Sequence, residues 1–223
     1  MTIISAVFVP EGIAMAADSR LTGHFQRDYG NEIFTITDNS QKLLLVRNET
    51  VGVSFCGDAI LEGRTIADFI RLFDINEVET NDTVETIAYK LNRILENKYS
   101  QYEVSFFIAG FDFDQPFVYE VGQKKVIRMN VKENNNLYNG CIWHGEQEAI
   151  MKLFLGDNPT SFDFDLMPLK DAVDFAEYVV ELTIKYQRFQ DSFASCGGDI
   201  DLLVITKDYT KFVRHKILNP KTS

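Results

Sequence analysis

The residues in this chain that commonly do chemistry are few, and their spacing argues against several mechanisms. None of the three histidines has the spacing of a Ser–His–Asp triad: His24, His144 and His215. The three cysteines are an odd number and lack the paired spacing of a metal site: Cys56, Cys141 and Cys196. The sequence therefore predicts neither a bound metal nor another cofactor.

Thr2 is a different kind of nucleophile, because it follows Met1 and is small enough for a methionine aminopeptidase to expose it. A Thr hydroxyl attacks poorly until a base takes its proton. The freed α-amino group of Thr2 would have an ordinary pKa of about 8, so a useful fraction would be neutral at pH 7. Nucleophile and base would then share one residue, and no histidine would be needed.

The composition is that of an ordinary globular protein. Hydrophobic residues make up 45% of the 223 residues and include 18 Phe, enough for a sizeable core. Since 33 acidic residues outnumber 22 basic ones, we expect neither nucleic acid nor an anionic membrane surface as a partner. The apolar runs are too short to span a bilayer. Without a visible signal peptide, and with an odd number of cysteines, we expect a cytoplasmic protein.

Nine segments read as strands, because they are rich in β-branched and apolar residues and are bounded by turn residues. They are Thr2–Val9, Ile13–Asp18, Lys42–Val46, Val51–Cys56, Val104–Phe111, Phe117–Val121, Val126–Val131, Ile200–Thr206 and Lys211–Ile217. The polar stretch Thr22–Asn31 is expected to be a loop.

Four segments show the 3.6-residue period of an amphipathic helix. The first carries Ile66, Phe69, Ile70 and Phe73. The second begins near Asp82, with Asp82 as N-cap and Glu85 at the third helical position. The third is Glu146–Phe154, and Pro168, near the first helical position, opens the fourth.

Strands and helices occur in blocks rather than in strict alternation, which favours the α+β class. The run Phe106-Phe107-Ile108-Ala109 does not alternate, so its strand is expected to be covered on both faces. We therefore predict a single domain over residues 1–223, a four-layer αββα sandwich of two antiparallel sheets.

Six short motifs in this order resemble a proteasome-type β subunit, in the family that also holds HslV and Anbu. Thr2 lies sixteen residues before Asp18, a spacing most similar to the Anbu branch. The motifs are Thr2, Ala16-Ala17-Asp18-Ser19-Arg20, Lys42-Leu43-Leu44, Cys56-Gly57-Asp58-Ala59 opening a helix, Ile108-Ala109-Gly110-Phe111-Asp112, and Ser195-Cys196-Gly197-Gly198-Asp199.

This resemblance implies an N-terminal nucleophile hydrolase with Thr2 as nucleophile. Asp18 is then the carboxylate beneath it, and Lys42 is the lysine that pairs with Asp18. A buried ammonium near Thr2 would favour the less protonated forms of its hydroxyl and amine. Read singly, Asp18 is equally a cap at a strand end and Lys42 a solvated start of a strand.

The remaining family positions match less directly. An Asp and a Ser near the amine correspond to Asp191 and Ser195 if single residues are inserted, whereas an ungapped match places Phe193 and Cys196 there. Asp191 could instead cap the preceding helix. His144 stands where the family has an orienting serine, either donating a similar hydrogen bond or serving as a structural residue. Ser54 is the nearest match to the residue whose backbone N–H binds the oxyanion.

The resemblance implies a threonine-type endopeptidase in a self-compartmentalising, homo-oligomeric ring that cleaves peptides or unfolded proteins. Leu61 and Phe154, expected on outer helix faces, would favour such a ring. No ATPase partner can be read from the sequence. Two alternatives remain: a non-catalytic scaffold or binding subunit of the same fold, and an N-terminal nucleophile amidohydrolase that acts on small amides.

Overall fold

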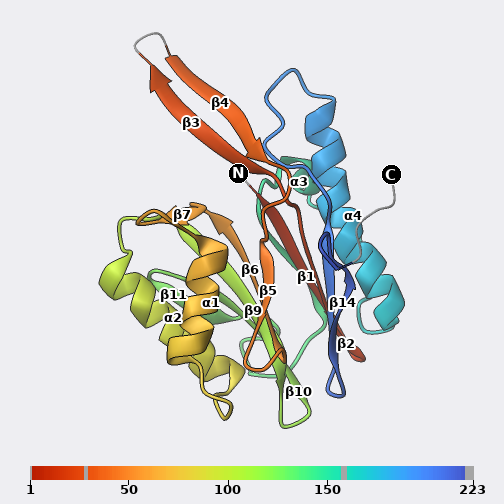
Figure 1. Cartoon of the computed structure of the whole chain (residues 1–223). Coiled ribbons are helices and arrows are strands. Elements are labelled where there is room, and N and C mark those ends of the chain that lie inside the picture. The colour runs from red at the N-terminus through yellow and green to blue at the C-terminus, as the bar shows by residue number, and fades with distance from the viewer. Residues whose placement is uncertain (1, 28–29, 157–159, 219–223) are drawn as a thin grey trace.

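The computed structural model describes residues 2–27, 30–156 and 160–218, which form two five-stranded antiparallel sheets, two short hairpins and four helices (Figure 1). The first sheet has the strand order β12-β1-β2-β13-β14. Its strands are β1 (Ile3–Val9), β2 (Gly12–Ala17), β12 (Gly140–Gly145), β13 (Asp201–Ile205) and β14 (Thr210–Arg214). The two ends of the described chain therefore meet in one sheet.

The second sheet has the order β11-β10-β9-β6-β5. Its strands are β5 (Leu43–Val46), β6 (Val51–Gly57), β9 (Val104–Asp112), β10 (Gln115–Gly122) and β11 (Lys125–Arg128). The helices are α1 (Ile66–Glu77), α2 (Val84–Lys98), α3 (Glu148–Phe154) and α4 (Leu169–Arg188). Helix α4 packs on β1 and β2, and α2 packs on β9 and β10.

Three hydrophobic clusters follow from this arrangement. One lies between the second sheet and α1 and α2, and another lies between the first sheet and α3 and α4. The third lies between the sheets and includes Ile4, Met15, Phe107 and Leu203. All seven side chains of β1 are buried because successive residues point into different clusters. This two-sided burial explains why the central strands read as continuous apolar runs.

The predicted mixture of antiparallel strands and helices is thus confirmed, but the segment Thr22–Asn31 is not a loop. Its described residues, 22–27 and 30–31, belong to β3 (Leu21–Arg27) and β4 (Gly30–Thr37), whereas 28–29 lie outside the described residues. The two strands pair as a hairpin that projects from the body (Figure 1). Phe25 and Phe34 stack at 4.9 Å between ring centroids. Cross-strand pairing stabilises this ribbon although little of it is buried, so its hydropathy alone did not reveal it.

Several boundaries also differ. The segment after Gly57 does not open a helix but forms the hairpin β7 (Ile60–Leu61) and β8 (Arg64–Thr65), and α1 begins at Ile66. Thr83, not Asp82, caps α2, since its side chain accepts from the Thr86 amide. Pro168 lies next to the first helical residue, as predicted, and is the N-cap of α4.

Other differences concern strand and helix ends. Strand β12 was not predicted. β11 ends at Arg128 and β14 at Arg214, so both stop short of the predicted Val131 and Ile217. Helix α3 begins at Glu148 rather than Glu146.

Leu61 and Phe154 do not lie on outer faces of helices. Leu61 belongs to β7 and is packed in the cluster beneath α1 and α2. Phe154 is buried at the end of α3, where its ring meets Trp143, Phe162 and Phe175. Both side chains are satisfied within the chain, so they provide no argument for a ring.

No helix within the described residues is both long and apolar enough to cross a membrane.

The contact between the two sheets can be tested at Gly52. A Cβ there would lie 2.7 Å from Leu203 and 2.8 Å from Met15, both fully buried across the interface. We expect Gly52→Val to lower the free energy of unfolding by about 1–3 kcal/mol through overpacking. The matched control is Gly122→Val in β10, where the nearest atom is 3.8 Å away. Urea unfolding of both variants checks this, and equal stabilities would contradict the described sheet packing.

Candidate active site

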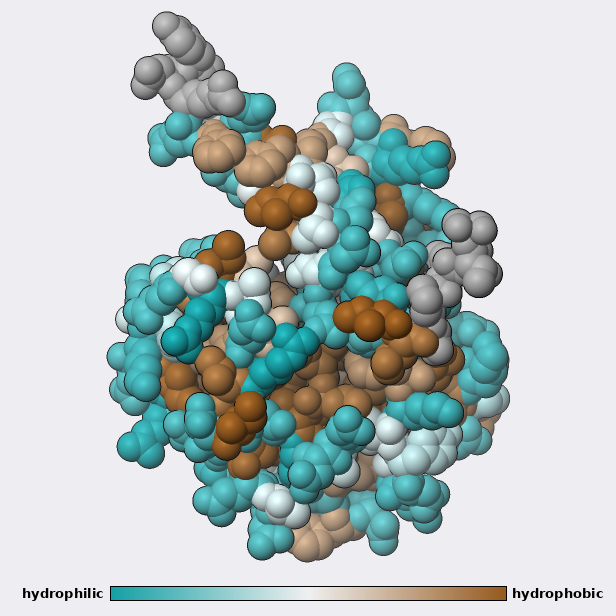
Figure 2. Space-filling model, viewed as in Figure 1, coloured by the Kyte–Doolittle hydropathy of each residue, from teal (hydrophilic) through white to brown (hydrophobic). Residues whose placement is uncertain are grey.

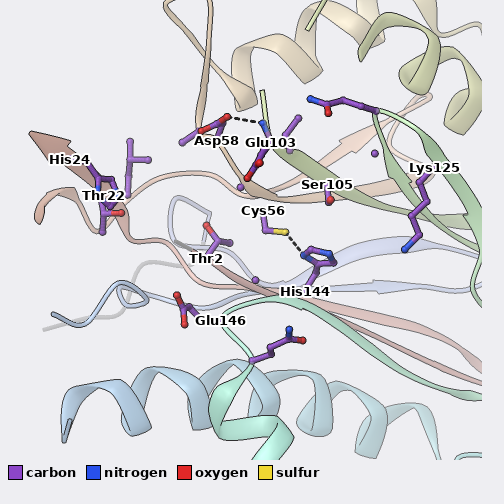
Figure 3. A pocket seen from close by; sticks show the side chains of 18 of the residues that line it. Thr2, Thr22, His24, Cys56, Asp58, Glu103, Ser105, Lys125, His144 and Glu146 are labelled. Carbon is purple, nitrogen blue, oxygen red and sulfur yellow. Dashed lines mark hydrogen bonds between the residues drawn. The ribbon is translucent and has the colours of Figure 1, made fainter. Parts of the chain in front are cut away.

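A cleft of about 1030 Å³ opens at the end of the molecule where β1 begins. Its walls come from both sheets, from the base of the β3–β4 hairpin and from the segment that precedes β7. Figure 2 shows the surface hollowed between the projecting hairpin and the part of the molecule that carries β7. Thr2, Cys56, His144 and Glu146 line this cleft (Figure 3).

Thr2 is held in the cleft wall by its backbone. Thr2 is only 5% exposed, and its carbonyl accepts a hydrogen bond of 2.8 Å from the Glu146 amide. Gly145 permits this approach: its φ is +104°, and a Cβ there would lie 1.9 Å from the Thr2 carbonyl oxygen. Only glycine tolerates both conditions, so Gly145 fixes the distance between β12 and Thr2.

Asp18 lies beside this position and is completely buried. Antiparallel pairing of β1 and β2 places it opposite Ile3, whose amide donates to Asp18 Oδ1 at 3.1 Å. Its Oδ2 accepts from the amides of Arg20 at 3.2 Å and Gly197 at 3.0 Å. The carboxylate therefore connects the start of β1, the end of β2 and the loop before β13.

Lys42 is the cation that compensates the Asp18 charge. Its Nζ lies 2.8 Å from Asp18 Oδ1 and donates to the Arg20 carbonyl at 2.5 Å, and the residue is 1% exposed. The same Asp18 oxygen thus accepts from Lys42 and from the amide of the Thr2–Ile3 peptide bond. This shared acceptor places the ammonium next to the Thr2 backbone, as the sequence motifs implied.

A second ion pair fixes the neighbouring loop. The Arg20 guanidinium binds both oxygens of Asp38, at 2.6 and 2.9 Å, and donates to the Ala194 carbonyl at 3.0 Å. The hydrogen bond from Arg20 lowers the pKa of the Asp38 carboxyl below its ordinary value. Arg20 therefore orders the segment that leads to Ser195, although its guanidinium is not part of the buried Asp18–Lys42 pair.

Ser195 and Asp191 end up in different places. Ser195 is buried, and its Oγ lies 3.1 Å from Gln187 Nε2 and 3.5 Å from Glu146 Oε1. Asp191 is exposed and does not line the cleft. The exposed Phe193 does not line it either, and Cys196 packs in the cluster beneath α4. Burial raises the pKa of the Cys196 thiol above its ordinary range.

Glu146 is the carboxylate that sequence reasoning missed at this site. It lines the cleft, its amide binds Thr2, and its side chain reaches the Ser195 hydroxyl. Glu146 follows Gly145 directly, but nothing in its local sequence marks it. The feature that places Glu146 in the site is the pairing of β12 with β1, and the sequence did not reveal β12.

His144 faces the interior of the cleft rather than standing alone. Its Nδ1 lies 2.9 Å from Cys56 Sγ (Figure 3). Its Nε2 lies 3.6 Å from Glu120 Oε1. Ser54, by contrast, is fully buried and does not line the cleft. Among the described residues its hydroxyl is the one buried side-chain atom without a hydrogen-bond partner.

Gly57, three residues after Ser54, does line the cleft. The Asp58 amide donates to the carbonyl of Glu103, the residue before β9, and the Phe55 amide donates to the Lys42 carbonyl on the opposite side. Because amide directions alternate along a strand, the Gly57 N–H points the same way as that of Phe55, beyond the end of β5. Its backbone amide is therefore directed away from β9.

No protein-family model matches the sequence, and no curated protein matches it. Among solved structures, the Gly-1 mutant of Anbu from Hyphomicrobium sp. strain MC1 superimposes with a TM-score of 0.63. The two chains are 15% identical, and the match covers 96% of this chain and 86% of that one.

The chain has the proteasome-like fold of Anbu. The resemblance predicted from the sequence motifs is therefore confirmed for the fold. At 15% identity, this likeness does not carry over the reaction. The functional argument rests on the site residues themselves. Among the described residues, no group of three His, Cys, Asp or Glu side chains is arranged to hold a metal ion.

Removing one member of the buried ion pair tests its electrostatic role. We expect Lys42→Met to lower the free energy of unfolding by about 3–5 kcal/mol, since the Asp18 carboxylate stays buried without its cation. The double variant Asp18→Asn/Lys42→Met should lose less than the sum of the single variants. The measurement is urea unfolding at pH 7.

The matched control is Lys170→Met, because Lys170 pairs with Asp174 on the exposed face of α4. An exposed pair of this kind contributes little, so we expect no measurable change in stability. If Lys42→Met is as stable as Lys170→Met, the described pairing of Asp18 is wrong.

Proposed function

We propose that this chain is a threonine-type endopeptidase of the N-terminal nucleophile class and a subunit of a proteasome-like assembly. Residues 1–223 would form one four-layer αββα domain. The observation that carries the proposal is the buried Asp18, which accepts from Lys42 and from the Thr2–Ile3 peptide amide through one oxygen. Asp18 thus holds the Lys42 ammonium next to the backbone of Thr2 in the cleft wall. The same carboxylate fixes the positions of Lys42 and of the Thr2–Ile3 peptide.

Removal of Met1 would make Thr2 the first residue and free its α-amine. The Thr2 hydroxyl then attacks a peptide carbonyl while the α-amine takes the hydroxyl proton. The amine returns that proton to the departing amino group, leaving an acyl ester on Thr2. In the second half, the amine activates water, which releases the acid and restores the hydroxyl. Lys42 favours the unprotonated amine and the developing alkoxide by its positive charge.

Gly57 is the proposed oxyanion donor in place of Ser54. Its amide is directed toward the end of β5, the same side of β6 on which the Phe55 amide donates to the Lys42 carbonyl. A backbone donor held by a sheet needs no rearrangement when charge develops on the carbonyl oxygen. Gly57 has a φ of +104°, and a Cβ there would lie 2.1 Å from the Glu103 carbonyl oxygen. Substituting Gly57 would therefore move the donor.

Glu146 and Ser195 are the proposed polar neighbours of the Thr2 amine, instead of Asp191. The Glu146 amide fixes the Thr2 carbonyl, and its carboxylate is linked to Ser195. Ser195 is in turn held by Gln187 from the end of α4. This set could orient the α-amine toward the Thr2 hydroxyl and accept a hydrogen bond from its protonated form.

Substitution of Thr2 tests the mechanism. We expect Thr2→Ala to reduce cleavage of fluorogenic peptides by roughly 10³-fold or more, because it removes the attacking hydroxyl. Thr2→Ser should retain part of the rate, since hydroxyl and amine both remain. A peptide epoxyketone should add to Thr2 through both groups, which intact mass and peptide mapping detect.

Thr210→Ala on β14 is the control, because it removes a Thr hydroxyl outside the cleft and should leave cleavage unchanged. A fully processed protein that cleaves no peptide and forms no adduct would support the scaffold alternative. Turnover of small amides without peptide cleavage would support the amidohydrolase alternative. Unchanged cleavage in Thr2→Ala would exclude Thr2 as the nucleophile.

The assembly is proposed as a homo-oligomeric ring acting on peptides or unfolded proteins. It is supported by the likeness of the fold to Anbu. At micromolar concentration, native mass spectrometry should give one dominant species at a whole-number multiple of the chain mass. A spectrum with monomer alone would contradict the ring without affecting the assignment of Thr2.

A further inference from the structure

Three side chains from three strands form a second group of chemically reactive type, in which Cys56 and His144 line the same cleft and Glu120 lies buried behind them. Cys56 ends the buried part of β6, His144 lies on β12 and Glu120 lies on β10. Cys56 Sγ is 2.9 Å from His144 Nδ1, and His144 Nε2 is 3.6 Å from Glu120 Oε1. Lys125 holds the other Glu120 oxygen at 2.7 Å. Figure 3 shows the thiol and the imidazole facing each other within the cleft.

The protonation states of this group follow from burial and charge. Burial, and next the negative charge of Glu120, raise the pKa of the Cys56 thiol to about 12. The thiol is therefore protonated at neutral pH and donates to His144 Nδ1. We accordingly assign the imidazole proton to Nε2, which faces Glu120. A protonated thiol needs a general base to react, and the His144 imidazole that accepts its hydrogen bond can serve as that base.

Among the described residues, the other two cysteines have no imidazole partner. Burial raises the pKa of the Cys141 and Cys196 thiols as well. Cys141 Sγ faces the Ile142 carbonyl at 3.8 Å, and Cys196 packs among apolar side chains under α4. Within the described residues, Cys56 alone contacts an imidazole and lines the cleft. The chain thus contains internal controls for the reactivity of a buried thiol.

We propose that Cys56, His144 and Glu120 form a second nucleophilic site for the acyl group of peptide esters and amides, independent of Thr2. Cys56 is the nucleophile, His144 is the general base, and Glu120 orients and stabilises the imidazole. The Gly57 amide, directly after the nucleophile, is available to bind the oxyanion. Because no α-amine takes part, this site does not require removal of Met1, unlike the proposed threonine mechanism.

Besides the ester or amide substrate, the reaction consumes only water. Sulfur forms a bond to the carbonyl carbon while the thiol proton passes to His144 Nδ1. The bond from carbon to the leaving oxygen or nitrogen breaks, and the His144 proton goes to the leaving group. Water then attacks the thioester, with His144 taking and returning one proton, so that the acid leaves and the thiol is restored. The Glu120 carboxyl faces the transient imidazolium throughout.

The test uses a peptide p-nitrophenyl ester and the full-length Thr2→Ala protein, so that the threonine site cannot respond. After an acid quench, intact mass and peptide mapping should locate a thioester on Cys56, which hydroxylamine removes. Cys56→Ser and Cys56→Ala should both abolish this thioester. His144→Gln should slow its formation by roughly 10²-fold or more, the usual contribution of a general base. Cys196→Ser should leave the rate unchanged.

Glu120→Gln distinguishes an orienting role from a purely structural one. It should lower the acylation rate and alter its pH profile, because it removes the charge opposite Nε2. Circular dichroism of each variant establishes that it is folded. A folded Thr2→Ala protein that gains no thioester on Cys56 would overturn the proposal. Equal acylation of Cys56 in His144→Gln would overturn it too, as would equal acylation of Cys196.

Discussion

The buried carboxylate of Asp18 is the interaction on which the arrangement of this molecule depends. An ionised carboxylate without water must be paired and hydrogen-bonded, or its burial would cost several kcal/mol. Asp18 meets this condition with four donors, from Ile3, Arg20, Lys42 and Gly197. These donors come from segments that are far apart in the chain. One charge therefore fixes where β1 starts, where β2 ends and where the loop before β13 passes.

The packing between the two sheets explains why the cleft lies at this end of them. Farther along, the space between the sheets is filled by apolar side chains such as Met15, Phe107 and Leu203. Near Thr2 that filling gives way to polar groups and to two glycines with positive φ, Gly57 and Gly145. Each glycine lets a strand end approach a neighbouring carbonyl that a side chain would block. The cleft is thus bounded by rigid strands, which favours fixed positions for catalytic groups.

The two proposed nucleophiles, Thr2 and Cys56, share this cleft but have opposite electrostatic surroundings. Thr2 lies next to the Lys42 ammonium, which favours loss of a proton from nearby groups. Cys56 lies toward Glu120, and burial together with the Glu120 charge keeps the thiol protonated, so that the proposed reaction needs His144 as base. The hydroxyl would depend on a processed N-terminus, whereas the thiol would not. A single cleft could therefore support acyl transfer by two routes whose activation differs.

From local hydropathy, the sequence by itself indicated the class of the fold and the core strands, and through the resemblance of its short motifs to a known family it implied the Asp18–Lys42 pair. It did not determine β12, the β3–β4 hairpin or the burial of Leu61 and Phe154, since those depend on pairing and packing between distant segments. The candidate site residues that follow α4 show the same difference between what the sequence and what the tertiary structure determines. Asp191 and Ser195 are four residues apart, yet one is exposed and the other is buried beside Glu146. The contact of Cys56 with His144 joins residues 88 positions apart, and only the packing of one sheet on the other brings them within hydrogen-bond distance.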